Sequence, residues 1–455
     1  MPVLIVNLYG VYMNFEKIGL QVPEILLPNK DIDLHKWSVV ACDQYTSQPD
    51  YWEQVKKNAE GSPSTLNVIF PEVFLEDAGG EQRISDINQT MQQYLDKGVL
   101  QPMQNKGFVL VDRKTSKAPS RKGLIVAIDL EAYDFSKGSH TLIRATEGTI
   151  VNRLPPRIKV RQDAAIELPH IMVLIDDPQR SVIEPRFEQN PSPLYDFDLM
   201  MNSGHVKGYA IDSPQMIQQV ADKLEHLASP DVFAKKYNAA GKDVLLYAMG
   251  DGNHSLATAK AIWEKIKEKA SDSQSVMHNP ARFALVELVN IHDEGLQFEP
   301  IHRVIFNVNP EQLLDAMQKH FQGSCTLHRC DNEADMKSRA ASAKTDGVHI
   351  IPFNDAAGYG FIQIDNPEFT LELATLESFL NDYLDKTGGK VDFIHGDEVV
   401  NELGVKAGNM GFFFPPIDKH SLFKTIIFDG ALPRKTFSMG EADEKRFYLE
   451  ARRIK

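Results

Sequence analysis

The stretch MGDGNHS, residues 249–255, says more about this chain than any other segment. An apolar run, Val244–Met249, precedes it and predicts a buried strand. A helix is predicted after it, because apolar residues recur there at helical spacing: Ala259, Ile262, Trp263 and Ile266. A strand, a glycine-rich turn and a helix N-terminus bind anions well, since free N–H groups and the positive end of the helix dipole face the turn. Residues 249–255 are therefore the expected site of chemistry.

The same residues also have a plain structural interpretation. Asp-Gly and Gly-Asn pairs are ordinary turn residues, and Asn or Ser beside a helix start is an ordinary N-cap. His254 would then be a buried histidine with satisfied hydrogen bonds. A turn without function is the alternative that the other features of the chain must outweigh.

Composition limits the kind of partner. The chain has 455 residues, 42% of them hydrophobic and 25% charged, which is ordinary for a globular protein of two or three domains. The net charge of −14 and the lack of a long basic run argue against nucleic-acid binding, which needs a cationic surface. A small anionic molecule held by a few local cations is the substrate class that this charge allows.

The cysteines and the opening segment bear on location. Three cysteines are too few and too scattered for a disulfide framework, which favours a reducing, cytoplasmic compartment. The apolar opening, residues 1–15, is too short to span a bilayer and lacks the basic start of a signal peptide. It predicts a strand, or an extension ahead of Met13. No membrane partner is expected, and the oligomeric state stays open.

Helical and strand patterns intermix along the chain without a regular strand–helix–strand rhythm, which favours the α+β class. Gly107–Arg113 and Lys122–Asp129 predict an antiparallel pair of strands. Further elements are predicted as helices at 84–97 and 213–228 and as strands at 171–175, 283–291, 391–394 and 422–428. The composition changes near residue 310, so we expect a core at 14–310 and a C-terminal α+β portion at 311–455 that packs on the core.

The segment Leu142–Arg161 is the densest basic stretch of this acidic chain. It holds Arg144, Arg153, Arg157, Lys159 and Arg161 with a single carboxylate, Glu147. Surface ion pairs are one interpretation. The other is an anion clamp, because the guanidinium fork matches the oxygens of a phosphate or a carboxylate.

These pieces together resemble the uncharacterised bacterial and archaeal family known as domain of unknown function 1015. The matching segments occur in the family's order: Asp43 and its polar loop, 144–147, 175–178, 251–254, 300–303 and 432–438. The family's central motif resembles Asp-Gly-His-His-Arg, and positions 251–255 here are Asp-Gly-Asn-His-Ser. Ser255 thus stands where the family has an arginine.

The central motif is also similar to the phosphate-binding turn of the ParB and sulfiredoxin superfamily, one branch of which phosphorylates free serine with a nucleotide. The resemblance implies a ParB/sulfiredoxin-like nucleotide-binding core, and fold-level analogy does not fix function. The first hypothesis is therefore a kinase of free serine or a similar hydroxy amino acid that uses ATP or ADP with Mg²⁺.

Phosphoryl transfer requires a phosphate cradle, neutralising cations and a carboxylate near the acceptor hydroxyl. The expected nucleotide- and phosphate-binding residues are Gly250, Asp251, Gly252, Asn253, His254, Ser255 and Lys260. Asp251 is expected to hold Mg²⁺, and Arg144, Arg157 and Arg161 to bind the substrate or other anionic groups. The expected catalytic residues are Asp43, Glu147 and His254, the two carboxylates as candidate bases.

Two alternatives remain. A non-catalytic nucleotide- or amino-acid-binding regulator would use the same pocket, and the absence of the motif arginine favours it. A metallophosphoesterase is suggested by Gly252-Asn253-His254 together with Asp33-Leu34-His35, but the further ligands of a dinuclear metal site are missing from the sequence.

Overall fold

The computed structural model describes residues 14–46, 48–75, 77–136, 138–189 and 192–455, so most of the apolar opening lies outside it. The described chain forms two compact units, one of residues up to 297 together with 440–455, the other of Phe298–Met439. This division differs from the expected ranges because 440–455 returns to the first unit, where β23 (Arg452–Arg453) pairs with β9 (Ile166–Glu167). No helix in the described part of the chain is long and apolar enough to cross a membrane.

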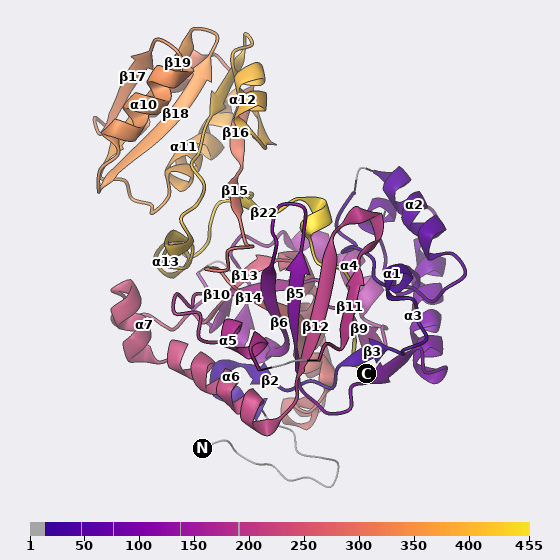
Figure 1. Ribbon diagram of the computed structural model, residues 1–455. Helices are drawn as coiled ribbons and strands as arrows, with labels where there is room; N and C mark the ends of the chain where they lie inside the picture. The colour runs from indigo at the N-terminus through magenta and orange to yellow at the C-terminus, as the bar shows by residue number, and fades with distance from the viewer. Residues whose placement is uncertain (1–13, 47, 76, 137, 190–191) are drawn as a thin grey trace. The chain divides into compact units, whose positions relative to one another are not determined.

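One large mixed sheet organises the first unit (Figure 1). Its path runs through β11 (Tyr195–Asp198), β12 (His205–Ile211), β5 (Phe108–Lys114), β6 (Arg121–Asp129), β14 (Phe283–Asn290), β10 (Met172–Ile175), β13 (Tyr247–Asp251), β8 (Ile143–Arg144) and β7 (Tyr133–Asp134). Two short strands extend it, since β2 (Leu20–Gln21) pairs with β6, and β1 (Asn14–Phe15) with β2. The pairs β10–β14, β13–β8 and β7–β8 are parallel. The predicted antiparallel pairing of β5 with β6 is confirmed.

Both faces of this sheet are buried. In β5, Val109 and Val111 enter one apolar cluster, and Phe108 and Leu110 enter a second cluster on the opposite face. This alternation follows from the two-residue period of a strand. A sheet covered on both faces needs apolar residues at consecutive positions, which is why the sequence of these strands is continuously hydrophobic.

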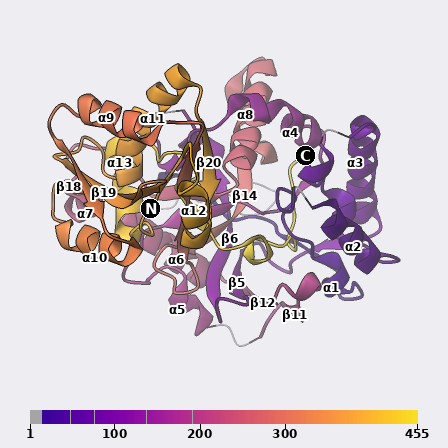
Figure 2. The same cartoon turned by 90° about the horizontal axis from the view of Figure 1, so that it is seen from above.

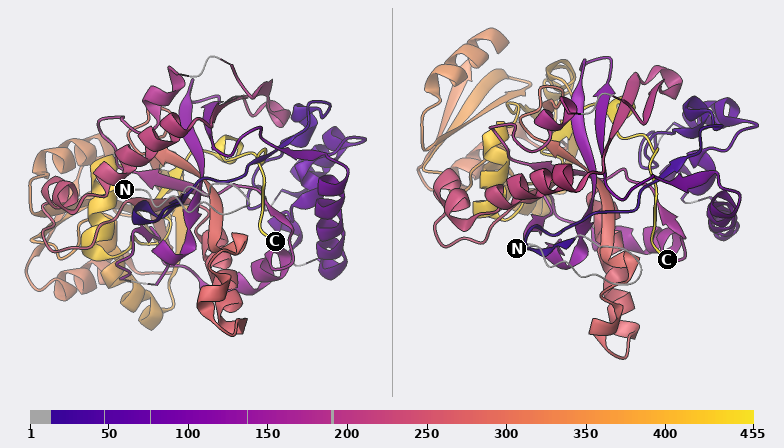
Figure 3. Two further views of the ribbon diagram at one scale, coloured as in Figure 1. Left: turned by 90° about the horizontal axis from the view of Figure 1, so that it is seen from below. Right: turned by 60° about the horizontal axis from the view of Figure 1, so that its bottom comes forward.

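Helices cover the two faces. The first cluster takes side chains from α2 (Pro49–Ala59) and α3 (Gly80–Asp96), and the second from α6 (Pro214–Leu227) and α8 (Asn253–Lys269). The helix α4 (Leu154–Arg161) lies beside α8 (Figure 2). The helix α1 (Leu34–Trp37) contacts β11, and α1 to α3 gather at this end of the sheet (Figure 3). Mixed pairing with helices on both faces confirms the α+β class.

The second unit has its own antiparallel sheet, in the order β17 (Cys325–Cys330), β19 (Gly358–Asp365), β18 (Val348–Asp355), β21 (Asn409–Phe412), β16 (His302–Phe306) and β20 (Lys390–Ile394). Side chains of α9 (Pro310–His320) and α11 (Glu372–Thr387) pack into one apolar cluster of this unit. Those of α10 (Glu333–Ala343) and α12 (Asp397–Gly404) pack into smaller ones. The strands β15 (Phe298–Pro300) and β22 (Phe437–Met439) lie at the beginning and the end of this unit in the sequence, and they pair with each other.

The predicted strand at 422–428 is wrong, because this segment lies in the helix α13 (Lys419–Asp429). Its branched and aromatic residues are typical of strands by composition. Its burial follows a helical period instead: Leu422, Phe423, Ile426 and Ile427 are buried, whereas Phe428 is exposed. Packing of one apolar face has overridden local propensity here.

Candidate functional site

The turn at 249–255 has the geometry predicted for it. The strand β13 ends at Asp251 and the helix α8, 17 residues long, begins at Asn253. Gly252 joins them with a φ of +80°, and a Cβ at this position would lie 3.1 Å from the Cα of Ile171. Only glycine meets both requirements without strain, because its lack of a Cβ removes the penalty of a positive φ and allows the close approach.

The N-terminus of α8 is open. Among the residues that the structure describes, no side chain caps it, whereas Ser213 caps α6 by accepting from the N–H of Met216. The N–H groups of Ser255 and Leu256 donate to the carbonyl of Gly252, each at 3.0 Å. Helix geometry leaves the N–H groups of the first turn, on Asn253 and His254, without a partner inside the helix.

Two side-chain atoms in the same turn are also unsatisfied. Asn253 Oδ1 and His254 Nε2 are buried, and neither has a hydrogen-bond partner among the described residues. A buried polar atom without a partner costs free energy, so such atoms gather where a ligand or water completes the network. These atoms and the open helix end point to a binding site rather than to a plain structural turn.

Asp251 is held on both oxygens. Its Oδ1 accepts from the N–H of Gly252 at 2.9 Å, and its Oδ2 lies 3.1 Å from the Nζ of Lys445. Burial acts to raise the pKa of this carboxyl, but the ammonium of Lys445 and the bond from Gly252 outweigh it and lower the pKa. Asp251 is therefore a carboxylate that joins the turn to the C-terminal segment.

A cavity of about 130 Å³ opens beside the first turn of α8. Its apolar wall comes from α3, α4, β14 and the segment around Val68–Phe70. Its polar wall is formed by Cys42, Glu72, Arg157, Arg161, Glu167, His170, Ser255, Thr258 and Tyr448. An apolar pocket with a few convergent polar groups is the usual form of a small-molecule site.

Arg157 and Glu72 form the charged pair of this cavity. The guanidinium of Arg157 lies 2.5 Å from Glu72 Oε2 and donates to the carbonyl of Arg153 at 2.8 Å. Burial raises the pKa of Glu72 despite the opposing effect of Arg157, and the carboxylate of Asp43 raises it further. Burial and the guanidinium groups of Arg157 and Arg153 lower the pKa of His254. A carboxylate with a raised pKa beside a cation is suited to proton transfer.

Ser255 belongs to a chain of hydrogen bonds along the cavity wall. Its Oγ lies 2.8 Å from His170 Nε2, and the hydroxyl of Tyr448 lies 3.1 Å from His170 Nδ1. The N–H of Cys42 donates to the Tyr448 oxygen at 3.1 Å. Four segments far apart in the sequence thus meet at one wall.

The two predicted carboxylate bases differ in their positions. Asp43 is half-buried and lies close enough to Glu72, Cys42 and His254 to influence their pKa values. Glu147 follows β8, which runs parallel to β13, so the chain leaves both strands at the same edge of the sheet. Neither residue lines the cavity beside Ser255, whereas Glu72 does.

Arg144 lies outside the predicted anion clamp. It is buried, and its guanidinium donates to the carbonyls of Thr141, His140, Asp243 and Val244 at 2.8 to 3.4 Å. It joins the loops that precede β8 and β13, before the strands begin. Arg161 does line the cavity, but it is paired with Glu167 at 2.5 Å, and Glu167 also binds Arg452. Arg157 is paired with a carboxylate at the same distance, but its guanidinium also lies close enough to the turn to lower the pKa of His254, which makes it the best placed of the three for an anion at the turn.

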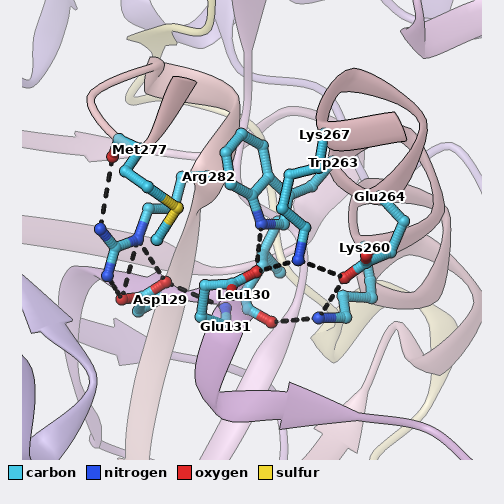
Figure 4. A network of polar contacts seen from close by, with 9 residues as sticks. All are labelled: Asp129, Leu130, Glu131, Lys260, Trp263, Glu264, Lys267, Met277 and Arg282. Carbon is cyan, nitrogen blue, oxygen red and sulfur yellow. Dashed lines mark hydrogen bonds and ion pairs between the residues drawn. The ribbon is translucent and has the colours of Figure 1, made fainter. Parts of the chain in front are cut away.

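Lys260 also turns away from the phosphate-binding turn. Its Nζ donates to the carbonyl of Leu130 at 2.9 Å and lies 2.7 Å from Glu264 (Figure 4). Beside it, Glu131 binds Lys267 and the indole N–H of Trp263. Lys260 is therefore part of a network that holds α8 against the loop after β6. Lys260 is close to the turn in sequence, but the rotation of the helix between Ser255 and Lys260 directs its side chain to another side of α8.

The motif expected for a metallophosphoesterase has other partners. Asp33 caps α1 by accepting from the N–H of His35, and His35 Nδ1 lies 2.8 Å from the carbonyl oxygen of Asp198. Within the part of the chain that the structure describes, no group of three or more His, Cys, Asp or Glu residues is arranged to hold a metal ion.

Sequence reasoning missed Glu72, His170, Lys445 and Tyr448. Glu72 lies in a short 3₁₀ turn and His170 in a loop, and neither has a motif around it. Lys445 and Tyr448 lie in 440–455, which the sequence assigned to the C-terminal portion. A proline directly before His170 is an ordinary loop feature, so no local signal distinguishes these four residues.

Comparison with known proteins gives the chain a family. The family model described as "Protein of unknown function (DUF1015)" matches residues 26–379, more than half of the chain. The chain belongs to this family. No curated protein matches it. The resemblance of the motifs to this family is thus confirmed. The description of the family names no activity.

Solved structures provide distant likenesses. A mutant free serine kinase in complex with AMP has a TM-score of 0.39 and 9% identity, covering 75% of this chain and 94% of that chain. A conserved hypothetical protein from Pyrococcus furiosus has a TM-score of 0.33 and 10% identity, covering 71% and 90%. C-terminally truncated SbnI from Staphylococcus aureus has a TM-score of 0.33 and 9% identity, covering 70% and 83%. Scores this low do not establish a shared fold, and the proposals below rest on the sequence and geometry of this chain.

Proposed function

We propose that this protein is a nucleotide-dependent phosphotransferase that phosphorylates free serine or a similar small hydroxy amino acid. The observation that carries the proposal is the cavity at the N-terminus of α8, which brings together the guanidinium of Arg157 and the carboxyl of Glu72. A phosphate cradle, a cation and a base are the groups that phosphoryl transfer requires.

The nucleotide phosphates would bind at the open helix end. The N–H groups of Asn253 and His254 and the positive end of the α8 dipole favour an anion there. Arg157 would supply the neutralising charge from the neighbouring helix α4. His254, neutral because its pKa is lowered, would donate or accept a hydrogen bond at Nε2. Asp251 would support this turn through Gly252 and Lys445 rather than touch the phosphates.

Glu72 is the base that the geometry favours. It lines the cavity, and burial raises its pKa towards the range in which a general base works near neutral pH. The carboxylate of Asp43 raises this pKa further. The substrate class, a free hydroxy amino acid, comes from the resemblance of the turn at 251–255 to the serine-phosphorylating branch of the ParB and sulfiredoxin superfamily.

Mg²⁺ does not fit at Asp251 as first expected. Both carboxylate oxygens already have partners, and one of these is the ammonium of Lys445, which would repel a divalent cation. The charge of the phosphates would instead be met by Arg157, the helix end and any cation that arrives with the nucleotide.

A non-catalytic regulator is the second candidate. It is favoured by Ser255, which replaces the arginine of the family motif, and by the engagement of Arg157 with Glu72. In this case the protein would bind a nucleotide or an amino acid at the same cavity without turnover.

The deciding experiment is incubation of the protein with ATP or ADP and a panel of amino acids, with products identified by mass spectrometry. Phosphorylated serine is the expected result, and nucleotide binding without product would support the regulator. His254→Ala and Asp251→Ala are each expected to weaken nucleotide binding about tenfold or more in calorimetry. Lys260→Ala is the matched control, because this cation of the same helix faces Leu130 and Glu264. Unchanged affinity in both site variants would overturn the assignment.

A further inference from the structure

The proposed function leaves Ser255 without a role, although its hydroxyl faces the cavity in contact with a histidine. Its Oγ lies 2.8 Å from His170 Nε2, and His170 Nδ1 lies 3.1 Å from the hydroxyl of Tyr448. A nucleophile in contact with a base that is itself oriented by a third group is the arrangement that activates a serine. All three side chains line the same cavity as Arg157.

The hydrogen bonds of Tyr448 determine which protons are available. Its oxygen accepts from the N–H of Cys42, and its hydroxyl also contacts the Cys42 side chain. Burial and the neighbouring thiol raise the pKa of Tyr448 well above its usual value, so the phenol stays protonated. In the tautomer that carries its proton on Nδ1, His170 donates to the Tyr448 oxygen. His170 Nε2 then carries a lone pair and accepts from the Ser255 hydroxyl.

The surroundings of Ser255 suit a phosphoryl acceptor. It lies in the first turn of α8, where the N–H groups of Asn253 and His254 are directed out of the helix. Developing negative charge on phosphoryl oxygens is stabilised by such donors. Arg157 adds a cation from the helix α4, which lines the same cavity.

We propose that Ser255 is a catalytic nucleophile that accepts a phosphoryl group, with His170 as its general base and Tyr448 as a positioning residue. The donor, a nucleoside triphosphate, rests on the proposed function. In the step, the Oγ–P bond forms as the bond from the γ-phosphorus to the bridging oxygen breaks. The Ser255 proton passes to His170 Nε2 and then to solvent, and nucleoside diphosphate leaves with the bond electron pair.

The phosphoserine then transfers its phosphoryl group to the acceptor. The acceptor hydroxyl attacks the phosphorus, and its proton passes to the Glu72 carboxylate and then to solvent. The Oγ–P bond breaks, and Ser255 Oγ takes up a proton from solvent through His170 Nε2 as it leaves. The enzyme returns to its first state, and the phosphoryl group has moved from nucleotide to acceptor in two displacements.

A phosphonofluoridate probe tests the nucleophile without any nucleotide. The probe forms an Oγ–P bond with an activated serine and releases fluoride, and intact mass with peptide mapping locates the adduct. One adduct on Ser255 is expected, and none in Ser255→Ala. His170→Ala is expected to slow labelling about 100-fold or more, and to remove the dependence of the labelling rate on pH.

Two further variants sharpen this test. Tyr448→Phe is expected to slow labelling less than His170→Ala does and to shift the pH dependence of the labelling rate. A purely structural role of Tyr448 would leave this pH dependence unchanged. His205→Ala is the control, because this histidine contacts Asp196 and Asp198 on the strand β11, and it should label at the parental rate. Circular dichroism of each variant confirms that the fold is retained. Absence of label on Ser255, or a parental rate in His170→Ala, would overturn the proposal.

Incubation with ATP separates this inference from the proposed function. Phosphoserine at position 255 supports the two-step route. If Ser255→Ala still phosphorylates free serine from ATP, the phosphotransferase stands and the phosphoenzyme is overturned. If Ser255 takes the probe but no phosphorylated amino acid forms with the parental protein, the nucleophile stands and the proposed acceptor fails.

Discussion

At the scale of single residues, the most consequential group is Glu72. Burial raises its pKa, so the folded protein holds this proton more tightly than the unfolded chain does. Protonated Glu72 therefore makes its whole contribution to the free energy of unfolding at a pH below the usual carboxyl pKa. This contribution is lost as the pH rises through the raised pKa of Glu72 in the folded protein. As a base it must be ionised, so turnover should fall on the acid side at a higher pH than for an ordinary glutamate.

Glu72→Gln tests both consequences. The variant is expected to lose turnover about 100-fold or more, and its stability should vary less with pH between the usual carboxyl range and neutrality. Urea unfolding and turnover measured across this range check the two effects. Glu53→Gln, an exposed glutamate of α2, is the control. An acid limb that survives in Glu72→Gln would assign it to another base, such as Asp43 or His170.

Arg144 is a residue whose role is structural. Arg144→Met removes a guanidinium that serves four carbonyls, and the expected loss in unfolding free energy is about 1–3 kcal/mol. Nucleotide affinity should remain at the parental value. Arg180→Met, which removes an exposed arginine paired with Glu294, should change stability by about 0.5 kcal/mol or less. A stable Arg144→Met variant with weak nucleotide binding would show that Arg144 contributes to the binding site.

At the scale of elements, the junction of β13 and α8 depends on Gly252. Gly252→Ala places a methyl group 3.1 Å from the Cα of Ile171 in addition to the strain of a positive φ. Gly241→Ala is a matched control, since its φ is +77° and nothing lies within 4 Å of the added Cβ. Backbone strain costs about 1–2 kcal/mol in both variants. Thermal unfolding should show a larger loss for Gly252→Ala, and that variant alone should lose nucleotide affinity. Equal losses would mean that the close approach to Ile171 has no energetic consequence.

At the scale of the whole molecule, the return of 440–455 completes the first unit. Arg446 lies 3.3 Å from Glu287 on β14 and also binds Glu450, and all three side chains are buried. Arg446→Leu would leave two buried carboxylates without their cation, at an expected cost of about 3–5 kcal/mol. Arg453→Ala, an exposed change in the same segment, is the control. Urea unfolding of both variants checks this, and a loss of less than about 1 kcal/mol in Arg446→Leu would show that the segment is not anchored by this pair.

Features that depend on near neighbours in the chain follow from the amino-acid sequence alone. The period of two in β5 and β6, the apolar run before residue 249, the glycine at 252 and the helical spacing after it are local properties, and the structure has each of them. The same is true of the family, because its motifs are short segments in a fixed order. The strand predicted at 422–428 is wrong, because the prediction followed the strand-like composition of this segment and not the helical spacing of its apolar residues.

Which distant side chains meet depends on the tertiary fold. His170 and Ser255 are 85 residues apart, and Tyr448 lies 278 residues beyond His170. Such contacts arise when the strands assemble into the sheet and the last segment returns to it, and no local pattern encodes them. The direction of Lys260 and the four carbonyl partners of Arg144 were fixed in the same way, by the packing of α8 and of the loops before β8 and β13. The turn at 249–255 is thus a property of the sequence, and the chemistry around it is a property of the fold.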